Sequence, residues 1–177
     1  MTHARAMVAK KDYAQAVVEF DKAIALQPQW ASVITERAFA REALGDLDGA
    51  MTDYDTVLRL APDSAHALSH AAWIRALRDV DLDQALAYSD KGQAIEPNID
   101  VIDTRGFVHF RRGEFAAALQ NYNVVLKKFP RSATTLYMRG VVERRLGDTA
   151  TGDADIARAV KMEPDTAERW TRRGVTP

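Results

Sequence analysis

Two histidines and two aspartates are the residues whose types and spacing could bind a metal ion. His66 and His70 stand four residues apart, so on a helix both imidazoles would point to the same side. Asp100 and Asp103 lie further along the chain and would supply a third ligand, a combination that suits zinc. Paired histidines on exposed helices often occur by accident as solvated or hydrogen-bonded surface residues. We favour this second interpretation and assign no metal ligand.

Residue patterns typical of enzymes are nearly absent. The sequence has no glycine-rich phosphate-binding loop, no nucleophile elbow and no cysteine to act as a nucleophile. Aspartates and glutamates are numerous, but carboxylates on helices mostly cap helix ends or solvate exposed faces. We therefore predict a protein that is not an enzyme, with no catalytic residue and no cofactor.

Composition and charge narrow the class of protein further. The 177 residues are 47% hydrophobic and 28% charged, which is typical of a globular domain. Because 24 basic residues nearly balance 25 acidic ones, general binding to nucleic acid is disfavoured. No segment approaches the ~20 apolar residues of a membrane span, and the charged start does not resemble a signal peptide. We expect a cytoplasmic protein, or a periplasmic or secreted one if an upstream signal peptide is missing.

Five prolines divide the chain into repeats. They are separated by 34, 35, 33 and 34 residues, at Pro28, Pro62, Pro97, Pro130 and Pro164. A fixed period of this length is the signature of a stacked-repeat fold. The spacing predicts one domain, 1–177, with a partial repeat over about 1–30 and a capping helix at 167–177. Four full repeats lie between these segments, at 31–64, 65–98, 99–132 and 133–166.

Each repeat contains the start and stop signals of two helices. In the first full repeat the break is Leu44-Gly45-Asp46, where the glycine suits a left-handed helix end and the aspartate can cap the next helix. The proline then ends the second helix. Small residues recur in the first helix and allow close helix packing, at Ala38, Ala72, Gly106 and Gly140.

These positions carry a family resemblance. The sets Ala38, Gly45, Ala50, Tyr54, Leu58, Pro62 and Gly106, Gly113, Ala118, Tyr122, Leu126, Pro130 resemble the tetratricopeptide repeat consensus. The resemblance covers essentially the whole chain. It implies an all-α fold, a right-handed α-solenoid of about five stacked 34-residue helix–turn–helix repeats. It also implies a protein–protein interaction scaffold, without naming a partner.

In that family the first helices line a concave face, which locates a predicted groove. The residues after the small ones are turned by about a quarter of a rotation, and three of them are aromatic. The same stripe includes Thr35, Glu42, Ser69 and Asp103. We predict that the groove binds a peptide or partner helix through aromatic and arginine residues, and that acidic groups of this partner would meet the arginines. They are Phe39, Trp73, Phe107, Phe110, Tyr137, Arg111, Arg144 and Arg145.

Other interpretations of the same residues stay open. The aromatic residues Phe39, Trp73 and Phe107 would be core if they packed between neighbouring first helices. The incomplete first repeat leaves an open N-terminal end, through which a homodimer could assemble. The chain could also be the interaction domain of a larger enzyme or secretion component. The lysine–asparagine clamp that grips acidic chaperone tails in some tetratricopeptide domains is absent here.

A second arginine series precedes the small residues, at Arg37, Arg105, Arg139 and Arg173. Its recurrence predicts a structural role, in which each arginine bonds an acidic side chain or a carbonyl of an adjacent helix.

Overall fold

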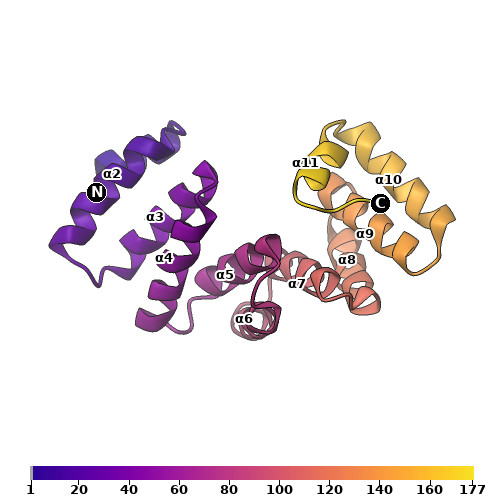
Figure 1. Ribbon diagram of the computed structural model, residues 1–177, viewed down its shortest axis with the longest axis horizontal. Coiled ribbons are helices and arrows are strands. Elements are labelled where there is room, and N and C mark those ends of the chain that lie inside the picture. The colour runs from indigo at the N-terminus through magenta and orange to yellow at the C-terminus, as the bar shows by residue number, and fades with distance from the viewer. Residues whose placement is uncertain (1) are drawn as a thin grey trace.

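The computed structural model describes residues 2–177, and all eleven regular elements of this part of the chain are helices (Figure 1). In chain order they are α1 (Thr2–Ala9), α2 (Tyr13–Leu26), α3 (Ala31–Leu44), α4 (Leu47–Leu60), α5 (Ala65–Arg78), α6 (Leu82–Ile95), α7 (Ile99–Arg111), α8 (Phe115–Lys128), α9 (Ala133–Arg145), α10 (Thr149–Met162) and α11 (Thr166–Arg172). The predicted all-α solenoid is confirmed. None of these helices is long and apolar enough to cross a membrane.

The turn within each repeat follows from its residues. Gly45 takes a left-handed conformation after α3, and the Asp46 side chain accepts a hydrogen bond from the Gly49 amide at the start of α4. The repeat over residues 65–98 has no glycine at this turn. There Asp79 and Asp81 adopt the left-handed conformation, which aspartate tolerates better than most residues. This is the point where the sequence has one additional residue.

Small residues set the distance between the two helices of a repeat. In the last repeat α9 and α10 approach so closely that a Cβ atom on Gly140 would lie 2.6 Å from the carbonyl oxygen of Gly152. In earlier repeats a fully buried tyrosine, Tyr54 or Tyr122, fills the space beside the small residue. The core follows the solenoid as three successive clusters of buried side chains, because each repeat packs mainly on its neighbours.

Arginines bond the carboxylates of neighbouring helices. Arg37 donates to the buried carboxylate of Asp53 at 2.6 Å, and Arg139 donates to the buried carboxylate of Asp155 at 2.6 Å. Arg105 bonds Asp90 at 2.6 Å. The structural role predicted for this series is confirmed at these three positions, and Arg173 behaves differently, as described below.

The solenoid curves around a central section made of α5, α6 and α7 (Figure 1). Helices α2 to α4 rise on one side of this section and α8 to α11 rise on the other, with α11 turned toward the inside of the curve. The first helices α3, α5, α7 and α9 therefore contribute residues to one continuous face.

Candidate functional site

The last helix, α11, packs into the inside of the curve. Its Trp170 is 2% exposed. The ring centroid of Trp170 lies 5.3 Å from that of Phe107 on α7 and 6.3 Å from that of Trp73 on α5. Trp73 and Phe107 are themselves 4.9 Å apart. Trp73 and Phe107 of the predicted aromatic series are therefore brought together and are covered by the chain's own Trp170, whereas Phe39 packs against Tyr13 instead.

The predicted groove arginines contact the chain itself. Arg111 donates a hydrogen bond to the main-chain carbonyl of Arg173, and Arg145 donates one to the carbonyl of Thr176 at 3.1 Å. Arg144 pairs with Asp153 on α10 at 2.8 Å. Two of these three guanidinium groups thus hold the segment after α11, and the third faces the outer helix.

The aromatic residues predicted for the groove differ in exposure. Phe39 is 40% exposed, and Trp73 and Phe110 are partly exposed. Phe107 is 1% exposed and Tyr137 is 0% exposed. These last two rings are core in this structure, which corrects the expectation that they face a partner. Phe107 is covered by Trp170 and by the Arg111 guanidinium, 5.1 Å from its ring centroid. The repeat spacing alone carried no sign of this cover.

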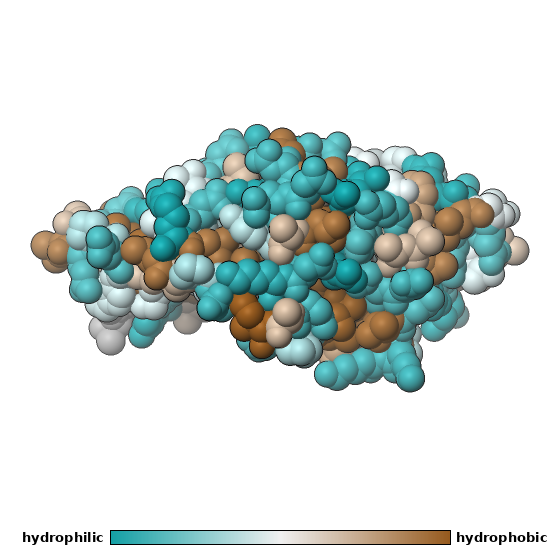
Figure 2. All heavy atoms as spheres, turned by 90° about the horizontal axis from the view of Figure 1, so that it is seen from below, coloured by the Kyte–Doolittle hydropathy of each residue, from teal (hydrophilic) through white to brown (hydrophobic). Residues whose placement is uncertain are grey.

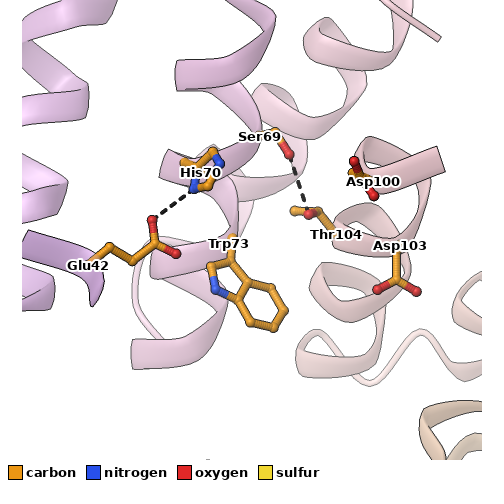
Figure 3. A pocket seen from close by; sticks show the side chains of 7 residues that line it. All are labelled: Glu42, Ser69, His70, Trp73, Asp100, Asp103 and Thr104. Atoms are coloured by element: carbon orange, nitrogen blue, oxygen red, sulfur yellow. Dashed lines mark hydrogen bonds and ion pairs between the residues drawn. The ribbon is translucent and has the colours of Figure 1, made fainter. Parts of the chain in front are cut away.

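The groove is open between α3, α5 and α7. A pocket of about 370 Å³ lies there, and Figure 3 shows its lining of Glu42, Ser69, His70, Trp73, Asp100, Asp103 and Thr104. Of these residues Trp73 was predicted as a groove contact, and Glu42, Ser69 and Asp103 were placed on the same helical stripe. His70, Asp100 and Thr104 lie outside that stripe and were not predicted for the groove.

Two interactions connect the helices around the pocket. The His70 Nδ1 lies 2.8 Å from a Glu42 oxygen and links α5 to α3. The hydroxyls of Ser69 and Thr104 lie 3.4 Å apart and link α5 to α7. The Tyr54 hydroxyl also donates to Glu42 at 3.3 Å, so this carboxylate is held in place from two sides.

Asp103 is the most perturbed carboxyl group in the groove. The pKa of Asp103 is raised to about 6, chiefly by burial and also by the charge of Asp100, while the hydrogen bond from Thr135 opposes the rise. That bond joins the Thr135 hydroxyl to Asp103 Oδ1 at 3.0 Å. The pocket therefore contains a carboxylate whose ionised form is held at a free-energy cost.

The histidine pair forms a stack. The rings of His66 and His70 lie 4.3 Å apart by centroid, and His70 faces Glu42. Burial, together with the charge of His70, lowers the pKa of His66. Within residues 2–177 no group of three histidine, cysteine, aspartate or glutamate side chains is arranged to hold a metal ion.

The opposite side of the molecule is mostly hydrophilic. Figure 2 shows the face seen from below, where apolar side chains form separate patches among polar ones. The aromatic residues Trp73, Phe107 and Trp170 instead form one cluster inside the curve.

Comparisons with known proteins agree with this architecture. The family model for the tetratricopeptide repeat matches residues 36–64. A solved structure of MamA 41-end from Desulfovibrio magneticus RS-1 has a TM-score of 0.80 at 14% identity, and the match covers 93% of each chain. The chain thus contains a tetratricopeptide repeat over residues 36–64 and shares the fold of this solved structure. PilW, described as a type IV pilus biogenesis factor, has a TM-score of 0.79 at 20% identity over 91% of this chain and 74% of its own.

Two curated relatives are much longer than this chain. It is 24% identical over 159 residues to the human mitochondrial import receptor subunit TOM70, which covers 89% of this chain and 21% of TOM70. It is 32% identical over 83 residues to the heat shock protein sti1 homolog of Schizosaccharomyces pombe, which covers 47% of this chain and 13% of that protein. The chain thus spans about a fifth or less of these relatives. Proteins with this fold typically act by binding other proteins.

Proposed function

We propose that this protein is a non-enzymatic scaffold that binds a peptide segment or helix of a partner protein across α3, α5 and α7. The observation that supports this function is the packing of α11. One part of the concave face already binds a helix, through the buried Trp170 and two arginine-to-carbonyl hydrogen bonds. The adjoining part, with the 370 Å³ pocket, offers the same kind of surface without such a cover.

The pocket has the features of a groove that takes a helix or an extended segment. Trp73 gives an aromatic wall, and Phe39 of α3 is a 40% exposed apolar residue that lines a separate pocket of about 220 Å³ with Val8. Anchor side chains in such grooves are often worth ~2 kcal/mol or more. Polar groups from three helices surround the wall and would fix the orientation of the bound segment. A solved protein of the same fold, YrrB, is described as having an unusual peptide-binding site; it has a TM-score of 0.75 at 15% identity over 99% of this chain and 90% of its own.

Site-specific cross-linking tests this function. A photoreactive phenylalanine analogue replaces Phe39 in the groove, and in a matched protein it replaces Val124, an exposed apolar residue on the outer helix α8. Both proteins are irradiated in lysate, and the joined proteins are identified by mass spectrometry. We expect a partner joined at position 39 and not at position 124. Equal cross-linking at both positions, or a partner joined only at 124, contradicts groove binding.

A further inference from the structure

The open part of the groove is acidic, and the charges come from two helices. Glu42 of α3 and Asp100 and Asp103 of α7 line the same pocket (Figure 3). Within residues 2–177 neither aspartate has a lysine or arginine at ion-pair distance, and Glu42 is bonded by His70 and Tyr54. Carboxylates elsewhere in the solenoid, such as Asp53, are matched by arginines. Within the described residues the two aspartates thus form no ion pair, although Lys128 and Arg131 line a neighbouring pocket that shares both of them.

The next pocket along the groove already holds a cation. The guanidinium of Arg173 lies 5.5 Å from the ring centroid of Trp73 and 5.2 Å from that of Trp170. This second pocket, of about 310 Å³, is lined by Arg173 together with Glu42 and Trp73, which also line the first. One side of the wall formed by Trp73 and Glu42 therefore accepts an arginine of the chain itself. A cation above an aromatic face beside a carboxylate is favoured by both neighbours.

From this charge complementarity we infer that the partner segment is basic, with a lysine or arginine seated between Glu42, Asp100 and Asp103 and an apolar side chain packed on Trp73. The inference rests on the proposed function, because it names the chemistry of the segment bound there. An acidic segment would be repelled at the same place. Arg111 and Arg145, which would attract it, are engaged by the carbonyls of Arg173 and Thr176.

Electrostatic matching across such a groove governs which partner is selected more than how tightly it binds. Each carboxylate is partly hydrated, so the expected discrimination is modest. We expect a basic segment to bind about tenfold more tightly than an acidic one of the same shape, a difference of ~1.4 kcal/mol. The preference should shrink as salt is added, because exposed charges are screened.

Three fluorescent peptides test the inference with the full chain. They share one amphipathic sequence with a single tryptophan, and two positions next to it carry arginine, glutamine or glutamate. Fluorescence anisotropy gives the three dissociation constants. We expect the order arginine, glutamine, glutamate from tightest to weakest. In the double variant Asp100→Asn, Asp103→Asn the arginine preference should fall at least threefold. The control Asp81→Asn, which changes an exposed aspartate at the start of α6, should preserve it.

Each outcome separates the inference from the proposed function. If the glutamate peptide binds as tightly as the arginine peptide, the basic-partner inference is overturned while groove binding stands. An arginine preference that the double variant leaves unchanged also overturns the inference, because the cation then sits elsewhere. If none of the three peptides binds while position 39 cross-links no partner, both the inference and the proposed function fail.

Discussion

Replacing Trp170 with alanine should release α11 from the groove. The seven-residue helix is too short to be stable alone, so its position depends on contacts with the rest of the solenoid. Trp170 is the largest of these contacts, since its ring is buried against Phe107 and Trp73. Other contacts include the buried Thr166 and Val175, the guanidinium of Arg173 over the Trp73 ring, and the hydrogen bonds from two arginines.

The size of the effect follows from these contacts. A buried tryptophan removes ~150–250 Å² from water, which at ~25 cal/mol per Å² corresponds to about 4–6 kcal/mol. Truncation of such a ring to alanine typically costs ~3–5 kcal/mol. The two hydrogen bonds contribute ~0.5–1.5 kcal/mol each, and burial of Val175 adds ~1.5–3 kcal/mol. Trp170 thus contributes more stabilising free energy than any other single contact of α11. Without it, α11 should be detached from the groove for much of the time.

Hydrogen exchange followed by mass spectrometry measures this release. Amides from Thr166 to Val175 should exchange much faster in Trp170→Ala, whereas amides of α4 should keep their protection. The control Arg172→Ala removes an exposed side chain of the same helix, whose ion pair with Glu168 is worth only ~0.3–0.5 kcal/mol. The reasoning is refuted if α11 keeps its protection without Trp170, or if Arg172→Ala releases it equally.

Two further substitutions test the packing and the charge of the solenoid. Gly140→Ala places a Cβ atom 2.6 Å from the Gly152 carbonyl oxygen. We therefore expect the free energy of unfolding, measured with urea, to fall by ~1–3 kcal/mol. An unchanged unfolding midpoint would contradict the close approach. Asp103→Asn removes a carboxyl group whose pKa burial raises from 3.8 to about 6. Because the folded pKa is the higher one, the cost of ionisation grows as the pH rises from about 4 to 6 and is complete above that. The asparagine variant should therefore have a free energy of unfolding at most ~3 kcal/mol higher than the native chain at pH 7. Near pH 4 the two free energies should be equal. Identical unfolding curves at pH 7 would exclude the buried charge.

The fold was predictable because its signals are local and repeated. Gly45 and Asp46 end one helix and begin the next through contacts within a few residues. The arginine series was predictable for the same reason, since Arg37 and Asp53 occupy fixed places within one repeat. A pattern that recurs at a constant period specifies contacts between neighbouring helices.

The composition of the groove was predictable only in part. The stripe through Trp73 and Glu42 was visible in the sequence, but its cover was not. Trp170 meets Phe107 and Trp73, which lie two and three repeats earlier, and only the curvature of the solenoid brings α11 to them. Curvature depends on the summed packing of all repeats, including the irregular turn at Asp79, and no local pattern contains it.

Trp73 connects the two parts of the groove. Its ring contacts Phe107 and Trp170 on the side of α11, and the same ring lines the open pocket between α3, α5 and α7. Glu42 lines that pocket and also the one that holds Arg173. A segment bound in the open pocket would therefore contact the same two side chains as α11. If either of them displaced Trp73 or Glu42, the contacts of the other would change. Because such coupling is reciprocal, a partner segment that bound more tightly with α11 in place would stabilise the packing of α11 by the same free energy.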